Sequence, residues 1–230
     1  MKTMHPTFLL AAALLACGAR AQSTTTEPGA ATPTPTPPTS PTPSLLPATS
    51  GEWSFGGSVY TYFVPDDGNY AQPTVTADRG MLHLEARYNY EDRDTGSVWI
   101  GGNFHFGDEL TWDITPMIGG VFGDTAGIAP GYHSTISWWK LEFYSEAEYV
   151  FDTRESSDSF FYTWSELTVS PVESLRVGLV IQRTKVYETD LDVQRGLLLG
   201  YSSEKLDFSA SYFNPDESEP VFVLSVGLGL

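Results

Sequence analysis

Apolar and polar residues alternate along most of the chain from Trp53 onward, and this period of two constrains the fold more than any other feature. In the segment MLHLEARYNYE, the even positions from Leu82 to Tyr90 are apolar or aromatic. The odd positions from His83 to Glu91 are polar or charged. Neighbouring residues of a strand point to opposite faces. The chain is therefore expected to form many β-strands, each with one apolar and one polar face.

Turn residues divide this region into about twelve strands. The sequence ADRG (77–80) reads as a tight reversal, and a second turn at Trp138–Trp139 keeps Ile136 and Leu141 on one face. The expected spans are 52–64, 70–77, 81–91, 96–106, 110–122, 127–137, 140–151, 159–169, 174–187, 191–201, 205–213 and 220–230.

The connections between these strands alternate in length and charge. One set is short and includes ADRG, GDE, WW, SPVES and SSEK. The other set is longer and acidic and includes VPDDGNY, EDRDTG, GDTAG, DTRESSDS, YETDLD and NPDESEP. Transmembrane barrels have short turns at one rim and longer loops at the other, so this sorting favours a barrel.

The final strand, VFVLSVGLGL, carries apolar residues at alternate positions up to the last one: Phe222, Leu224, Val226, Leu228 and Leu230. It resembles the terminal recognition strand of bacterial outer-membrane β-barrel proteins, although those usually end in an aromatic residue. The resemblance covers about residues 51–230 and concerns architecture, and the strand count is similar to that of outer-membrane phospholipase A and of small sugar-acid porins. It implies an all-β fold, a closed antiparallel transmembrane β-barrel of about twelve strands (alternatively ten), in which the last strand pairs with EWSFGGSVYTYF.

The first 50 residues predict export and a tether. Residues 1–21 read as a signal peptide, with Lys2 before the apolar run FLLAAALLA and a cut after Ala21. The sequence LLAC also resembles a bacterial lipobox, in which Cys17 would be lipidated instead. Residues 22–50 are rich in Pro and Thr and predict a disordered linker, and 51–230 predict the barrel.

Bulk composition is compatible with this organisation. No stretch after the N-terminus approaches about 20 continuous apolar residues, which excludes a transmembrane helix but leaves a transmembrane barrel possible. The formal net charge is −17, and we expect no nucleic-acid partner.

The two faces of the strands predict two different surfaces. The lipid-facing side is expected to carry aromatic belts, at the long-loop rim Tyr88, Tyr90, Phe122, Tyr149, Phe151 and Tyr212, and at the other rim Phe104, Phe106, Trp112 and Tyr201. The lumen is expected to be lined by His83, Glu85, Arg87, Asn103, Asp113, Lys140, Glu142, Glu146, Glu148, Arg176, Gln182 and Asp207. Such side chains either fill the lumen by pairing or line a channel, which the acidic excess would make cation-preferring.

Three basic residues break the apolar pattern of the outer face near the YETDLD loop: Arg183, Lys185 and Arg195. Guanidinium groups pair well with phosphate oxygens. We therefore expect these residues to contact lipopolysaccharide, or else to be solvated charges beyond the membrane.

Two histidines have a position compatible with a catalytic arrangement. His83 and His105 have inward parity on neighbouring strands, and Asp113 lies in the same rows, so they are weak candidates for a base–orienter pair. His133 and Ser134 are adjacent and point to opposite faces, so they cannot form a dyad. No HExxH or GxSxG motif occurs, and no metal site and no cofactor are predicted.

These observations predict a monomeric barrel in the bacterial outer membrane, with the N-terminal linker and the C-terminus on the periplasmic side. Its function is expected to be a small passive pore or a structural barrel with a charged lumen. One alternative is a barrel enzyme acting on lipid, and another is a soluble barrel that binds an apolar ligand. The expected partners are outer-membrane lipid, lipopolysaccharide and, during biogenesis, the barrel-assembly machinery.

Overall fold

A computed structural model describes residues 51–65, 68–186 and 192–230 of the chain. The predicted signal peptide (1–21), the choice between Cys17 and Ala21, and the predicted linker (22–50) lie outside the described residues. Within the described part, no helix is both long enough and apolar enough to span a membrane.

The described residues form thirteen strands and one short 3₁₀ helix, Ser156–Asp158. The strands are β1 (Ser54–Phe63), β2 (Tyr70–Arg79), β3 (Leu82–Tyr88), β4 (Thr95–Gly102), β5 (Phe104–Phe106), β6 (Leu110–Gly123), β7 (Gly127–Trp138), β8 (Leu141–Asp152), β9 (Phe160–Val172), β10 (Leu175–Val186), β11 (Asp192–Ser202), β12 (Leu206–Phe213) and β13 (Val221–Gly229).

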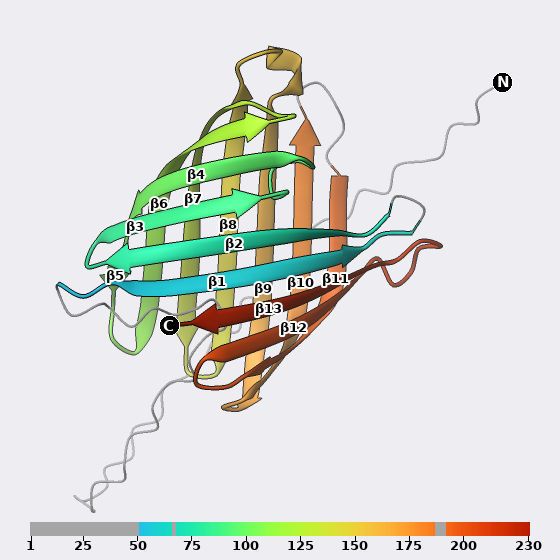
Figure 1. The fold of residues 1–230 in the computed structure, drawn as a ribbon. Helices are drawn as coiled ribbons and strands as arrows, with labels where there is room; N and C mark the ends of the chain where they lie inside the picture. The colour runs from blue at the N-terminus through green and yellow to red at the C-terminus, as the bar shows by residue number, and fades with distance from the viewer. Residues whose placement is uncertain (1–50, 66–67, 187–191) are drawn as a thin grey trace, which may run out of the picture. The chain divides into compact units, whose positions relative to one another are not determined.

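The sheet closes on itself. Every strand pairs with its neighbour in antiparallel fashion, and β13 pairs with β1, with Val226 opposite Val59 and Phe222 opposite Phe63. Both β4 and β5 pair with β6, so twelve strands form the closed barrel and β5 is an extra short strand. Figure 1 shows β1–β4 and β13 crossing in front of the more steeply drawn β7–β11. The predicted fold class and the count of twelve are confirmed, and the alternative of ten is wrong.

The strand expected over 96–106 is divided at Asn103. The backbone N–H of Asn103 donates to the Met81 carbonyl at 2.8 Å, and its side-chain amide donates to Asp78 at 2.6 Å. Asn103 therefore bonds to the β2–β3 hairpin, and the chain resumes as β5 along β6.

The two ends of the barrel differ in their connections. At one end, here called the short-turn end, two or three residues join the strands, as at Gly80–Met81 and Trp139–Lys140. Gly80 and Trp139 have φ values of 60° and 54°, the left-handed conformation that tight reversals require. The predicted turn at Trp138–Trp139 is thus one residue later in the structure. At the other end, the long-loop end, the connections include 64–69, 89–94, 153–159 and 214–220.

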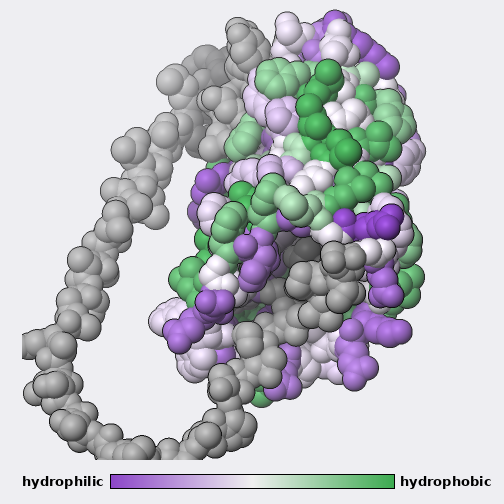
Figure 2. Space-filling view, turned by 90° about the vertical axis from the view of Figure 1, so that its left-hand side faces the viewer, coloured by the Kyte–Doolittle hydropathy of each residue, from purple (hydrophilic) through white to green (hydrophobic). Residues whose placement is uncertain are grey.

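The outer face of the barrel is apolar. Every strand carries exposed large hydrophobic side chains that alternate with inward-facing ones. On β13, for example, Phe222, Leu224 and Val226 are exposed, whereas Val223 and Ser225 are buried. Figure 2 shows broad green hydrophobic patches on one face, with purple hydrophilic side chains gathered near its margins. Such a surface is unfavourable in water and suits a hydrocarbon environment.

The expected aromatic rims are present, with one exception. Tyr88, Phe122, Phe151 and Tyr212 are exposed at the long-loop end, and Phe104, Phe106, Trp112 and Tyr201 are exposed at the short-turn end. Tyr149 lies beside Phe151, with ring centroids 4.5 Å apart. Tyr90 was expected here as well, but it points into the barrel. Strand β3 ends at Tyr88, and Asn89 has a φ of 56°, so the alternation of faces stops before Tyr90.

Much of the interior is apolar rather than polar. An aromatic cluster is formed by Tyr62, Trp164, Val180, Leu198, Phe213 and Val223 from β1 and β9–β13. A second cluster contains Trp99, Met117, Val121, Ala129, Val150 and Phe160. The contributing strands contain uninterrupted apolar runs such as LLL at 197–199, because both of their faces are apolar.

Candidate functional site

The centre of the polar lumen is Arg87, whose side chain is only 2% exposed. Its guanidinium donates from Nε to Glu85 and from Nη1 to Glu148 at 2.8 Å. Nη2 lies 3.2 Å from Nε2 of His133, and Glu91 lies 3.8 Å away from Nη1. We call Arg87, Glu85, Glu91, His133 and Glu148 the Arg87 network. It is the geometry in which a buried cation is tolerated, because opposite charges and hydrogen bonds replace its water.

Aromatic rings hold the guanidinium in place. The Cζ atom of Arg87 lies 4.2 Å from the ring centroid of Tyr90 and 4.5 Å from that of Trp99. Tyr90 in turn donates from its hydroxyl to Glu146. The 89–94 loop turns inward and therefore covers the Arg87 network with aromatic and acidic side chains.

Two contacts cross the lumen rather than following its wall. Arg87 is on β3 and Glu148 is on β8, which are four strands apart around the barrel. Tyr60 on β1 and Trp164 on β9 are five strands apart, yet their ring centroids are 6.0 Å apart in an edge-to-face arrangement. Because adjacent strands are separated by about 4.8 Å, such contacts require that the lumen is narrow at these heights.

A second ion pair lies towards the short-turn end. Arg176 on β10 donates from Nη1 to Asp207 at 2.6 Å and from Nη2 at 3.0 Å, and Ser202 bonds to the same carboxylate. The guanidinium passes over Gly200, where a Cβ atom would collide with it. A glycine on β11 is thus required for this bidentate pair to form against the wall.

The three histidines of the described residues are divided between two places. His83 bonds to Asp78 at 2.8 Å and to Glu85 at 3.1 Å, and Asp78 also accepts from Asn103. His105 bonds to Asp113 at 2.7 Å, and both of these side chains are more than half exposed. The structure therefore does not bring His83 and His105 together. Their contact was expected across β3–β4, but the register places His83 opposite Gly101.

One group of side chains has the composition of a metal site. Ligand atoms of His83, Glu85 and His133 lie within 4.8 Å of one another. Glu85 already accepts from Arg87, and the same guanidinium lies within hydrogen-bond distance of His133, so an ion pair and a hydrogen bond engage these groups. Among the described residues, no serine or threonine hydroxyl is hydrogen-bonded to His83 or His105.

The other predicted lumen residues occupy different heights. Glu146 accepts from Tyr90 and from Tyr144, and Glu142 accepts from Ser137 at 3.2 Å. Lys140 is in the β7–β8 turn and donates to the Pro171 carbonyl at 2.8 Å, so it is at the rim. Gln182 faces the long-loop end of the lumen.

The outward basic residues lie near the long-loop rim. Arg183 is opposite Val193 and is therefore diagonal to Arg195, and both arginines are exposed. The side chain of Lys185 is outside the described residues. Arg195 donates to Asp216 at 2.6 Å, and this hydrogen bond lowers the pKa of the Asp216 carboxyl below its usual value. The lipopolysaccharide contact stays a prediction.

Several residues that shape the lumen were missed in the sequence. Asp78 is part of the turn expected at ADRG but belongs to β2 in the structure. Glu166 is absent from the expected lumen lining, although it faces inward on β9. Tyr60, Tyr62, Tyr144, Tyr162 and Trp164 also point inward. Side chains alternate between the two faces of a strand. Tyr60 and Tyr62 therefore lie on the face opposite to the exposed Phe63, and Tyr162 and Trp164 on the face opposite to the exposed Phe161. This alternation would have identified the four residues as inward-facing.

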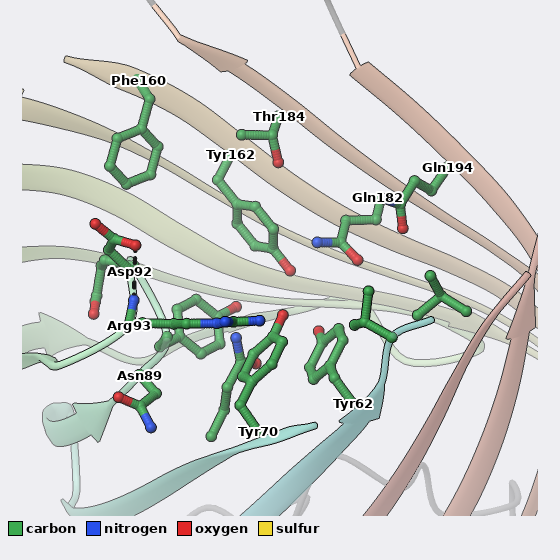
Figure 3. A pocket seen from close by; sticks show the side chains of 15 residues that line it. Tyr62, Tyr70, Asn89, Asp92, Arg93, Phe160, Tyr162, Gln182, Thr184 and Gln194 are labelled. Atoms are coloured by element: carbon green, nitrogen blue, oxygen red, sulfur yellow. Dashed lines mark hydrogen bonds between the residues drawn. The ribbon is translucent and has the colours of Figure 1, made fainter. Parts of the chain in front are cut away.

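A cavity of about 480 Å³ opens at the long-loop end of the barrel. Figure 3 shows Tyr62 and Tyr70 on one side of it, and Tyr162 and Gln182 facing them. We call this cavity the vestibule. It lies nearer the long-loop end than the Tyr60–Trp164 contact. Tyr62 follows Tyr60 by two residues towards the 64–69 connection, and Tyr162 precedes Trp164 by two residues on the side of the 153–159 connection.

No family model matches the chain, and no curated protein matches it. Among solved structures, the KdgM porin is similar with a TM-score of 0.56 and 9% identity, covering 76% of this chain and 99% of the porin. A structure of KdgM porin in complex with disordered oligogalacturonate gives the same values. The outer membrane protein Omp33 of Acinetobacter baumannii has a TM-score of 0.46 and 12% identity, covering 79% of this chain and all of that one. The chain therefore has the fold of an outer-membrane β-barrel, and the predicted resemblance is confirmed at that level.

Proposed function

We propose that this protein is an integral outer-membrane β-barrel with a constricted, charge-lined lumen, which passes water and small ions but excludes larger solutes. The observation that carries this proposal is the pair of cross-lumen contacts, Arg87–Glu148 and Tyr60–Trp164. A wide channel would leave such side chains hydrated on the wall, whereas the Arg87 side chain is 2% exposed.

A membrane location is supported by the outer surface. Its exposed aliphatic and aromatic side chains follow every strand, and the pairing of β13 with β1 closes the barrel, so that the edges of its first and last strands are paired. A soluble barrel would instead present polar residues outward. The lipid-enzyme alternative lacks support, since no hydroxyl is hydrogen-bonded to His105 among the described residues.

Any ions that pass are expected to be cations. Carboxylates facing the lumen outnumber the two guanidiniums of Arg87 and Arg176, and rings of one charge set ion preference. The carboxylates are Asp78, Glu85, Glu91, Glu142, Glu146, Glu148, Glu166 and Asp207.

Single-channel recording in planar bilayers tests the constriction. The unsubstituted barrel should show small, cation-selective conductance. Removing one cross-lumen contact with Tyr60→Ala and Trp164→Ala together should raise the conductance several-fold. The matched control is Leu167→Ala, an outward residue of the same strand β9. Large, weakly selective conductance of the unsubstituted barrel would mean that the lumen is an open porin channel instead.

The loop lengths support an orientation in which the short turns, the start of β1 and the end of β13 face the periplasm, because outer-membrane barrels carry their long loops outside. Thiol labelling tests it. A membrane-impermeant maleimide should label Glu217→Cys, in a long loop, on intact cells. Glu204→Cys, in a short turn, should react only after the outer membrane is permeabilised. The opposite pattern would contradict the proposed orientation.

A further inference from the structure

The vestibule has the size and shape of a ligand site. Its volume of about 480 Å³ is in the range of small-molecule pockets, and it is lined by aromatic rings and a few polar side chains. The Tyr60–Trp164 contact lies deeper in the lumen, so the lumen narrows below the vestibule rather than continuing as a wide pore.

Two unlike walls face each other across this cavity. On β1 and β2, Tyr62 and Tyr70 are stacked, with ring centroids 4.8 Å apart and an angle of 7° between the rings. On β10 and β11, Gln182 and Gln194 are directly opposite each other in register. Strands β1 and β10 are four apart around the barrel, so the tyrosine wall faces the amide wall, as Figure 3 shows for Tyr62 and Gln182.

One amide of this site lacks a partner. The Oε1 atom of Gln182 is buried and accepts no hydrogen bond from the described residues. Gln72, which also lines the vestibule, is 8% exposed. Buried amide atoms are normally satisfied, because each unmade hydrogen bond has a cost. A buried, unpartnered amide oxygen in this cavity therefore points to a ligand that donates hydrogen bonds, as hydroxyl groups do.

The charges around the vestibule disfavour an anionic ligand. Glu91 and Asp92 line it together with a single cation, Arg93, which lies 4.9 Å from the Tyr70 ring and contacts the Gly68 carbonyl.

We propose that the vestibule binds an uncharged, polyhydroxylated ligand of the size of a mono- or disaccharide. The amides of Gln72 and Gln182 hydrogen-bond its hydroxyl groups, and the apolar face of its ring lies against the Tyr62–Tyr70 stack. This site is separate from the conduction proposed above, because binding at the mouth requires no passage through the lumen.

Saturation-transfer NMR on the full, detergent-solubilised barrel tests the proposal with three probes: glucose, maltose and galacturonate. We expect saturation transfer to the two neutral sugars and markedly less to galacturonate. The variants Gln182→Leu and Tyr70→Ala should each weaken neutral-sugar binding by a factor of about 5 to 10, the effect of a lost hydrogen bond or ring contact.

The matched control is Tyr88→Ala, which removes an aromatic ring from the same end of the barrel on its outer face. Heat-dependent gel mobility reports that each variant is folded, and Gln72→Leu replaces either variant that is not. The proposal is overturned if neither neutral sugar binds, if galacturonate binds better than both, or if the folded vestibule variants bind as well as Tyr88→Ala.

Discussion

The two cross-lumen contacts of this barrel are built from opposite kinds of side chain. The Arg87 network joins β3 to β7 and β8 through charges, whereas the aromatic cluster fills the space between β1 and β9–β13 with rings and aliphatic side chains. Both regions narrow the lumen. The comparison shows that a barrel interior can be constricted by either chemistry, but the two constrictions respond differently to a lost side chain.

The physical difference lies in what remains after one member is removed. In the aromatic cluster a truncated side chain leaves a cavity, whose cost grows with the volume and area lost. In the Arg87 network a removed cation leaves buried carboxylates without their partner, which costs more than the contact itself contributed.

The largest effect is therefore expected for Arg87→Ala. Glu85 and Glu148 are 1% and 4% exposed at their side chains and would lose their guanidinium. Breaking a buried pair in this way costs about 3 to 5 kcal/mol of the free energy of unfolding. Urea unfolding of the barrel in micelles, followed by tryptophan fluorescence, measures it.

A double-mutant cycle identifies the cause of that loss. In the Glu148→Ala background, Arg87→Ala should cost at least about 1 kcal/mol less than it does alone, because one of the abandoned carboxylates is already absent. Equal costs in both backgrounds would show that the Arg87–Glu148 contact does not contribute to stability.

A smaller effect is expected in the aromatic cluster for Val180→Ala. Val180 is fully buried on the inward face of β10. Removing two methyl groups should cost about 2 kcal/mol from lost burial and the cavity that remains. The neighbouring Leu179→Ala, on the lipid-facing side, is the control in the same urea titration. A cost for Val180→Ala as large as that for Arg87→Ala would remove the distinction between the two regions.

The polar half of this comparison could be predicted from the sequence better than the apolar half. Strict alternation in MLHLEARYNYE predicts that His83, Glu85 and Arg87 face inward. The apolar pattern of the terminal strand predicts that this strand pairs with β1 and closes the barrel. Alternation also predicted twelve strands, because each turn resets the phase at a recognisable Gly, Asp or Trp pair.

The aromatic cluster could not be found by that rule. Leu198 lies inside a run of three leucines and Val223 inside FVL, where both faces are apolar and alternation carries no information. Tyr90 was assigned outward because the pattern continues through it, but the left-handed backbone of Asn89 ends the strand first. Contacts such as Arg87–Glu148, 61 residues apart, depend on strand order around the barrel and not on any local pattern.

The smallest effect is expected where an ion pair is not buried at all. Arg195 and Asp216 form a 2.6 Å contact at the long-loop rim, with side chains 68% and 59% exposed. Water screens such a pair, so Asp216→Asn should leave the urea midpoint unchanged, unlike the change at Arg87.

The Arg195–Asp216 pair should instead be detectable in the titration of Asp216, because the hydrogen bond to Arg195 lowers the pKa of this carboxyl. A depressed carboxyl pKa favours the folded state above the unfolded pKa of about 3.9, and this contribution is lost as the pH falls through the folded value. In NMR titration of the carboxyl carbon, Arg195→Ala should raise the Asp216 pKa towards the ordinary value of an aspartate. A pKa that is the same with and without Arg195 would show that the two side chains are not paired in solution, and would leave this guanidinium available for phosphate.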